Sequence, residues 1–559
     1  MSGSVAARAE RYGTPRLFLP AWAAFIVVLT TAPYLAAFLT TPKDWSYAWI
    51  LPPYPADSYA YRAWSKQAFD GAWLFSLKFT PRANRPFLFL PFFALAGRLA
   101  RLGGIDIGLV HLSLKAAGTG LFFWAFGGLL RRLRLNPFQS VAACVFAGIS
   151  SGLGGLLPLI RQSPLPRAWT PTDAWLVDSN TFWSLLWSPV YPFSLALIVL
   201  SLRFADEAFG DGDARKAYLS GFCVCALAVL HPYPVAVLLP LTALLAVVKR
   251  PRGALGLWLR LAVAALPGAG YVAGLSLLHP LIRAHNEIGS AQKVTIFAIF
   301  SGMGLPLALA GAGAYAGGAA FVRRHWLLLA WAGLCVTLAL CPVWLRSKYL
   351  FGSHLPVCLL AGAAAGDFFA GLRRNAAIAT LALIALPFTQ LVHFVDALSE
   401  VARNPDTAYR ISPGMRQALT YLDAHGAKSD VVFATPPTSA KVCAYAGDTV
   451  FWGHWAQAVD LDGQADMIRT ISSDDSWLPP SARRRRFWDF GIDYVLVDGD
   501  WRERFATGSA AALVAQADKV FENAETAIYR RRGAGKFPRN LSNQDSSSAL
   551  SRGSPISRR

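Results

Sequence analysis

The chain contains few charged residues for its length. Only 15% of its 559 residues are Asp, Glu, Lys or Arg, whereas 54% are hydrophobic, and an average globular domain carries about 25% charged residues. This composition excludes an ordinary water-soluble domain. Acidic residues are the scarcer kind, 33 against 53 basic ones, but most basic residues lie in short loops between apolar runs. Because that placement is typical of membrane topology, we expect no nucleic-acid partner.

Cysteine is also scarce and is not arranged to bind a metal. Six of the seven cysteines lie in apolar segments, and Cys443 lies in the polar C-terminal part. None of their spacings matches a zinc motif, so we interpret them as core residues. The glycines give no nucleotide-binding loop either, because Gly311-Ala312-Gly313 does not follow a strand.

Long apolar runs predict an α-helical polytopic membrane protein with about eleven spans, because roughly 20 apolar residues cross a bilayer. The first run covers residues 17–39. The run 219–248 is broken by His231-Pro232-Tyr233-Pro234 and predicts a broken hairpin. The run 87–102 contains two arginines, and we expect it to form an interfacial helix. The remaining spans are expected near 106–130, 138–160, 182–205, 255–278, 295–321, 326–345, 354–371 and 376–395.

The basic loops predict the orientation of the chain. Basic clusters recur in alternate loops, and the intervening loops hold fewer cations. By the positive-inside rule the N-terminus is cytoplasmic and the protein is a multi-pass component of the inner, cytoplasmic membrane. The first outer loop, residues 41–86, and everything after residue 395 then face the periplasm or cell exterior. The clusters are Arg131/Arg132/Arg134, Arg215/Lys216, Lys249/Arg250/Arg252, Arg323/Arg324 and Arg373/Arg374.

The hydrophobic pattern changes after about residue 412. Residues 415–425 predict a helix, and the apolar runs 430–434, 494–497 and 526–529 predict buried strands. We therefore divide the chain into a multi-span domain (1–395), a small periplasmic α/β domain (396–530) and a basic tail (531–559). The tail is rich in Ser, Gly and Arg, and we expect it to be disordered and to contact membrane lipids.

The first outer loop holds the residues best suited to chemistry. Asp57 follows a proline cluster and shares helical spacing with Tyr61 and Trp64. The cations Arg82 and Arg85 come shortly after. A carboxylate beside flat rings and cations can receive a sugar and a phosphate. A structural alternative stays open, because Asp is a preferred N-cap and aromatic residues gather at membrane interfaces.

Two later outer segments add charges next to apolar runs, where charges are costly and commonly functional. Asp173 and Asp178 precede one span, and Arg346, Lys348 and His354 follow another. A partly buried carboxylate in such a group can act as a general base. Neighbouring cations can stabilise the charge that develops on a departing phosphate.

In this order the motifs resemble the GT-C superfamily of integral-membrane glycosyltransferases, which use polyprenyl-phosphate-linked sugars. The resemblance covers residues 17–395 in architecture. Asp57 matches the acidic position of the family's first outer loop, and Arg85-Pro86 is similar to its basic-proline position. The late run Arg346-Ser347-Lys348-Tyr349 is similar to a basic motif of bacterial relatives, and Gly447–Trp455 is similar to part of their periplasmic domains.

The resemblance implies an inverting hexosyltransferase that moves a sugar from a polyprenyl-phosphate donor to a glycan, lipid or protein acceptor. Asp57 would be the general base. The predicted phosphate- and substrate-binding residues are Arg82, Arg85, Arg346, Lys348, His354, Tyr61 and Trp64.

Metal use stays open at this stage. Many relatives carry two adjacent acids in the first loop, whereas here Asp57 is followed by Ser58. This departure puts metal binding at Asp57 in doubt, although Asp173 or Asp178 could supply a second carboxylate; no cofactor is certain, and a divalent metal, Mg²⁺ or Mn²⁺, stays possible. We interpret His454 as a structural residue.

Two other classes of protein compete with the transferase. A transporter or flippase for a lipid-linked glycan would line a path with these charges, but such proteins usually contain repeated halves with matching broken helices, and the sequence contains one broken hairpin. A catalytically inactive membrane scaffold would bind partners through its periplasmic domain. The sequence identifies neither the sugar nor the acceptor.

Overall fold

The computed structural model describes residues 12–532 with internal gaps. Contacts divide the chain into two units, of which unit 1 comprises Met1–Phe75, Phe87–Arg416 and His454–Val459. Unit 2 comprises Ser76–Pro86, Gln417–Gly453 and Asp460–Arg559. The residues not described between 12 and 532 are 53, 83, 89, 161–165, 280–281, 284–291, 344, 373–385, 404–407, 455–456, 458–463, 465–487, 489–490, 506–513 and 516.

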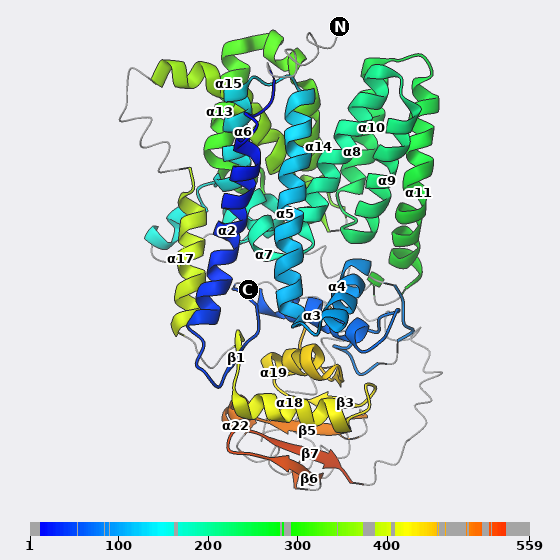
Figure 1. The fold of residues 1–559 in the computed structure, drawn as a ribbon, viewed down its shortest axis with the longest axis vertical. Helices are drawn as coiled ribbons and strands as arrows, with labels where there is room; N and C mark the ends of the chain where they lie inside the picture. The colour runs from blue at the N-terminus through cyan, green and yellow to red at the C-terminus, as the bar shows by residue number, and fades with distance from the viewer. Residues whose placement is uncertain are drawn as a thin grey trace. The chain divides into compact units, whose positions relative to one another are not determined.

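Unit 1 is a bundle of helices (Figure 1). Four described helices are long and apolar enough to cross a membrane: α2 (Phe18–Leu39), α5 (Ile107–Arg132), α11 (Ala254–Leu278) and α13 (Ile296–Arg324). The prediction of a mainly helical chain with helices long and apolar enough to cross a membrane is thus confirmed, while the count of eleven spans stays a prediction. The other long helices are α3 (Pro55–Phe69), α4 (Pro91–Gly103), α6 (Pro137–Ile149), α8 (Tyr191–Asp211), α9 (Ala214–Leu230), α10 (Val235–Lys249), α14 (Trp326–Leu340), α15 (His354–Leu372) and α17 (Phe388–Arg403).

Two predicted spans are wrong as continuous helices. The run 138–160 is helical only to Ile149, and Gly154–Ile160 forms the 3₁₀ helix η1. Between them Gly152 packs so closely on another segment that an added Cβ would lie 2.4 Å from the backbone at Ser301. The run 182–205 is divided into α7 (Thr181–Trp187) and α8, because Pro189 cannot continue a helix.

Other helices lie where the sequence predicts them. The break at residues 231–234 separates α9 from α10, as predicted for a broken hairpin. The helix expected at 87–102 is present as α4, Pro91–Gly103, and its interfacial location stays a prediction. Of the last predicted span, residues 376–385 lie outside the described residues, and α17 covers residues 388–395.

Helix α8 lies between α5 and α9, and α9 in turn packs on α11 (Figure 1). The last pair is in backbone contact, since a Cβ on Gly221 would lie 2.2 Å from the carbonyl oxygen of Leu261 and one on Gly268 2.2 Å from that of Cys225. Small residues permit such close packing in membrane helices. Helix α8 contains 21 residues, so its two ends lie about 30 Å apart.

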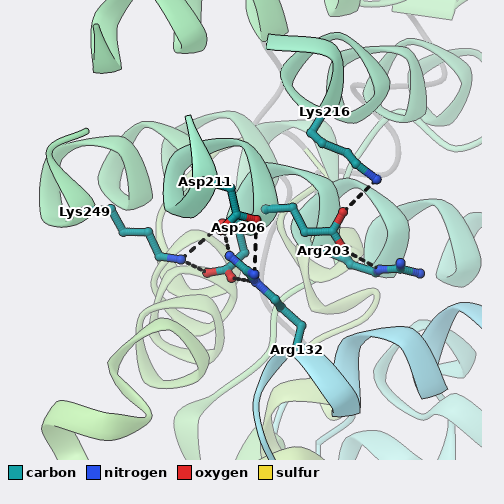
Figure 2. Close-up of polar contacts among 7 residues, drawn as sticks. Arg132, Arg203, Asp206, Asp211, Lys216 and Lys249 are labelled. Atoms are coloured by element: carbon teal, nitrogen blue, oxygen red, sulfur yellow. Dashed lines mark hydrogen bonds and ion pairs between the residues drawn. The ribbon is translucent and has the colours of Figure 1, made fainter. Parts of the chain in front are cut away.

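Ion pairs join α5, α8, α9 and α10 at one end of this bundle (Figure 2). Asp206 accepts from Arg132 Nε at 2.5 Å and contacts Lys249 Nζ at 2.6 Å. Glu207 accepts from Arg203 and contacts Lys216 at 3.0 Å. Residues from three of the basic clusters therefore meet at one end of the bundle. That this end faces the cytoplasm stays a prediction.

Unit 2 contains a five-stranded sheet in the order β4-β3-β5-β7-β6. Strands β4, β3 and β5 are parallel, and β5-β7-β6 are antiparallel. Phe433, Phe451 and Trp501 are among the buried residues of its core. The helix predicted at 415–425 corresponds to α18 (Pro413–His425). The strands are β3 (Val431–Phe433), β4 (Thr449–Val450), β5 (Tyr494–Val497), β6 (Ala517–Glu522) and β7 (Ala527–Arg531).

Candidate active site

Helix α3 begins at Pro55, directly after the proline cluster of the first outer loop. Proline suits the first helical position because its missing N–H is not needed there. The N-cap is Tyr54, without a side-chain cap hydrogen bond, and Asp57 lies in the first turn. The alternative that Asp57 is an N-cap is therefore wrong. Its negative charge is nevertheless well placed, because the N-terminal end of a helix carries positive partial charge.

Several long-range contacts fix α3 in unit 1. Tyr59 donates to the carbonyl oxygen of Ala408 at 2.6 Å. Arg62 forms a bidentate ion pair with Asp106, with hydrogen bonds of 3.0 and 2.6 Å. Asp106 is also the N-cap residue of α5. Bidentate pairs of this kind set direction as well as distance. The helix that presents Asp57 is thus held from two sides.

Asp57 contacts a histidine that is distant in sequence. Nε2 of His454 lies 2.9 Å from Oδ1 of Asp57, and both residues belong to unit 1. The side chain of His454 is 4% exposed and that of Asp57 27%. The carboxylate is therefore partly buried yet still reachable.

A second carboxylate lies in the 3₁₀ helix η3 (Val177–Ser179). Asp178 is 3% exposed and its Oδ2 accepts from Lys348 Nζ at 2.8 Å. Oδ1 has no hydrogen-bond partner in the described part of the chain, with His231 Nε2 3.8 Å away. Burial lowers the pKa of Lys348, but the attraction of Asp178 outweighs it and the net pKa is raised. Lys348 is therefore positively charged at neutral pH.

The hydroxyl group of Tyr61 is affected by the charges of both carboxylates. Burial raises the pKa of Tyr61 well above its usual value, and the charges of Asp57 and then Asp178 raise it further. Its hydroxyl therefore stays protonated and can donate. Its ring stacks on Phe93 at 4.8 Å, and His231 stacks on Tyr191 at 5.0 Å nearby in unit 1.

These residues come from separate parts of unit 1 and form one cluster. Asp57 and Tyr61 come from α3, Asp178 from η3 and Lys348 from η4 (Arg346–Leu350). Lys348 is under the electrostatic influence of Asp178, Tyr233 and Asp57. A carboxylate that can accept a proton, a fixed cation and hydroxyl donors are thus brought together.

Three other predicted site residues are bound to protein groups instead. Trp64 is 6% exposed and packs on Phe93. Asp173 accepts from the backbone N–H groups of Gly152 and Gly154, and burial still raises its pKa to about 7. His354 is 1% exposed and lies 3.0 Å from Thr181 Oγ1. Their substrate roles stay predictions.

The predicted arginines are not brought into this cluster by any described contact. Arg346 opens η4, and its Nε is buried without a hydrogen-bond partner in the described part of the chain. Arg82 and Arg85 are exposed and belong to unit 2. Phosphate binding by these three residues stays a prediction.

Sequence reasoning did not select His231, Tyr191 or Tyr233 for the site, and it interpreted His454 as structural. A signal existed for His231 and Tyr233, because both lie in the break between two apolar half-helices, where backbone and side chains can line a cavity. Nothing in the local sequence indicates that His454 meets Asp57, since 397 positions separate them.

The described residues do not assemble a metal site. They contain no group of three or more His, Cys, Asp or Glu side chains that could hold an ion. Asp57 is paired with His454 and Asp178 with Lys348. These paired groups offer fewer oxygen ligands than Mg²⁺ or Mn²⁺ need; metal use stays a prediction, and no step below depends on a metal.

Comparison with solved structures identifies the fold. A cryo-EM structure of a mutant of the arabinofuranosyltransferase AftD from Mycobacteria matches 93% of this chain and 42% of that chain, with a TM-score of 0.54 and 14% identity. The chain has the GT-C fold. It spans less than half of AftD, and at this identity the likeness establishes the fold alone.

Two other GT-C glycosyltransferases resemble the chain less well. ArnT from Cupriavidus metallidurans, bound to undecaprenyl phosphate, matches 92% of this chain and 98% of that chain with a TM-score of 0.48 and 11% identity. The oligosaccharyltransferase AglB from Archaeoglobus fulgidus, in complex with an inhibitory peptide and a dolichol-phosphate, matches 93% and 75% with a TM-score of 0.48 and 13% identity. No protein-family model and no curated protein sequence matches the chain.

Proposed function

We propose that this GT-C chain is a membrane glycosyltransferase. It would move a sugar from a polyprenyl-phosphate donor to a glycan, lipid or protein acceptor on the outer face of the cytoplasmic membrane. The observation that carries the proposal is the cluster of Asp57, Asp178 and Lys348 beside Tyr61 within one unit.

The proposed chemistry follows from the charges in the cluster. Asp57 removes the proton from the acceptor hydroxyl, whose oxygen attacks the anomeric carbon of the donor sugar. The bond from that carbon to the phosphate oxygen breaks, and the configuration inverts. Lys348 stabilises the negative charge on the departing lipid phosphate, and Asp178 keeps Lys348 charged and in place. The buried oxygen Oδ1 of Asp178 is free to accept from a sugar hydroxyl.

The test replaces Asp57 by Asn in a host that lacks the gene, followed by mass profiling of envelope glycolipids and polysaccharides. The matched control is Asp70→Asn, since Asp70 closes the same helix, is exposed and pairs with Lys66. We expect wild type and Asp70→Asn to restore one defined sugar and Asp57→Asn to restore at most about a hundredth of it.

Equal restoration by Asp57→Asn and wild type would contradict the proposal. Transport of labelled lipid-linked glycan across proteoliposomes, with no covalent product, would instead favour the flippase. If Asp57→Asn is silent while deletion of residues 412–530 is not, the protein is a scaffold.

A further inference from the structure

The contact between His454 and Asp57 has a defined geometry. An ionised carboxylate can only accept hydrogen bonds, so Nε2 of His454 is the donor to Oδ1 across 2.9 Å. The histidine side chain is 4% exposed, and a hydrogen bond to a charged group strengthens when solvent is excluded.

The backbone before His454 is also constrained. Gly453 has φ +142°, a conformation that L side chains rarely adopt, and an added Cβ would lie 2.9 Å from Cβ of Ser439. Gly453 is the last residue of its segment of unit 2, and His454 is the first of the following segment of unit 1. A residue with a side chain at position 453 would therefore be strained and would change the direction in which the chain delivers His454.

We propose that His454 is a positioning residue for Asp57: its Nε2–H group holds Oδ1, orients the carboxylate and favours the ionised form that can take the acceptor's proton. This role rests on the proposed function for its catalytic meaning. The effect on the ionisation of Asp57 can be measured independently of any transfer.

Other groups also face Asp57 and must be kept constant in a test. The charge of Asp57 acts on Lys348 in η4, on Tyr54 and Tyr61 at and within α3, and on Tyr191 at the start of α8. None of these residues is substituted in the His454 variants. A difference between His454 variants therefore reports on the histidine.

The experiment measures the protonation of Asp57 in the full chain, purified in lipid nanodiscs. A hydrophobic carbodiimide adds to the protonated form of a carboxyl group and leaves a stable N-acylurea, which peptide mass spectrometry can locate. Labelling of Asp57 is followed from about pH 4 to pH 9 in wild type, His454→Phe and His454→Gln. His425→Gln is the control, because His425 is exposed on α18.

We expect His454→Phe to move the midpoint of labelling upward by about one pH unit, which is about a tenfold weaker preference for the ionised form. His454→Gln places an amide N–H near the position of Nε2 and should restore the wild-type midpoint, and the control should not change it. A folded His454→Phe protein with the wild-type midpoint would overturn the proposal.

A second pair of measurements covers the case in which His454→Phe does not fold. His454→Asn keeps an amide but is too short to reach Oδ1, so its midpoint should rise as well. In the reciprocal experiment, Asp57→Asn should increase modification of His454 by diethyl pyrocarbonate about tenfold at neutral pH, because the hydrogen bond to the carboxylate is lost. Unchanged values in both would refute the role. If labelling shifts as expected while Asp57→Asn still restores the envelope sugar, the positioning role stands and the proposed function fails.

Discussion

Asp448 in unit 2 should make the stability of that unit depend on pH. The residue is 0% exposed, and neither carboxylate oxygen has a hydrogen-bond partner among the described residues. Burial raises its pKa from 3.8 to about 7, against the lowering effect of Lys428 and Lys78. An ionised carboxylate in such a position is costly.

The sign and size of the effect follow from linkage. The pKa of Asp448 is higher in the folded than in the unfolded chain, so the folded state binds more protons between about pH 4 and pH 7. Stability is therefore highest below about pH 4, falls through that interval and stays low above it. A difference of about three pKa units corresponds to at most about 4 kcal/mol.

The substitution Asp448→Asn removes the ionisation while nearly keeping the shape of the protonated acid. We expect the variant to be more stable than wild type at both pH 5 and pH 8, with less than half of the pH 8 advantage at pH 5, because wild type loses its stability progressively between about pH 4 and pH 7. Hydrogen–deuterium exchange of the peptides that contain β3 and β4, compared at equal pH in the full chain, measures the difference. At pH 8 exchange should be slower in the variant by tenfold or more, up to about a thousandfold.

The matched control is Asp518→Asn, whose side chain is 61% exposed and pairs with Arg532 at the surface. It should leave exchange in β3 and β4 unchanged at both pH values. The reasoning would be refuted if exchange in Asp448→Asn were faster than in wild type at pH 8. It would also be refuted if the difference in exchange between variant and wild type were the same at pH 5 and pH 8, because burial would then not disfavour the ionised form of Asp448.

Two further predictions concern unit 1. Asp206→Ala should lower the thermal midpoint of the full chain more than Asp211→Ala, because the Asp206 side chain is 15% exposed and holds two cations whereas that of Asp211 is 60% exposed. The expected losses are about 2 kcal/mol and less than about 1 kcal/mol, and equal midpoints would contradict the prediction. Lys348→Met should cost about 3 kcal/mol, because Asp178 would stay buried without this cation, and should abolish binding of the proposed polyprenyl-phosphate donor. Lys348→Arg should largely retain both properties, and a Met variant that binds as wild type would contradict the role.

The fold was predictable where a local pattern determines it. Long apolar runs gave α2, α5, α11 and α13 nearly to their ends, and the proline cluster after Leu230 gave the break between α9 and α10. The errors occur where a local breaker acts inside an apolar run, as at Pro189, or where tertiary packing decides, as at Gly152, which is in backbone contact with another segment. The hydropathy of a run does not reveal where its backbone contacts another segment.

Four residues of the candidate cluster were selected from the sequence, but their pairing was not predicted, and their roles stay predictions. Asp57, Tyr61, Asp178 and Lys348 were selected from their outer-loop positions, and the structure brings them into one cluster. The partner of each carboxylate could not be predicted. A charged residue beside an apolar run is energetically costly, but the sequence does not indicate which distant residue compensates that charge. His454 illustrates the limit, since its contact depends on how unit 1 gathers segments far apart in sequence.

The two carboxylates have different partners, and this difference distinguishes their roles. Asp178 is 3% exposed and contacts a lysine whose pKa is raised, so its partner keeps a charge throughout the neutral range. Asp57 is more exposed than Asp178 and contacts a histidine instead of a lysine. A pair with a fixed cation suits a group that must stay ionised, whereas a base must take up and release a proton in each turnover. These differences support the proposed roles, in which Asp57 is the base and Asp178 holds Lys348 charged at the departing phosphate.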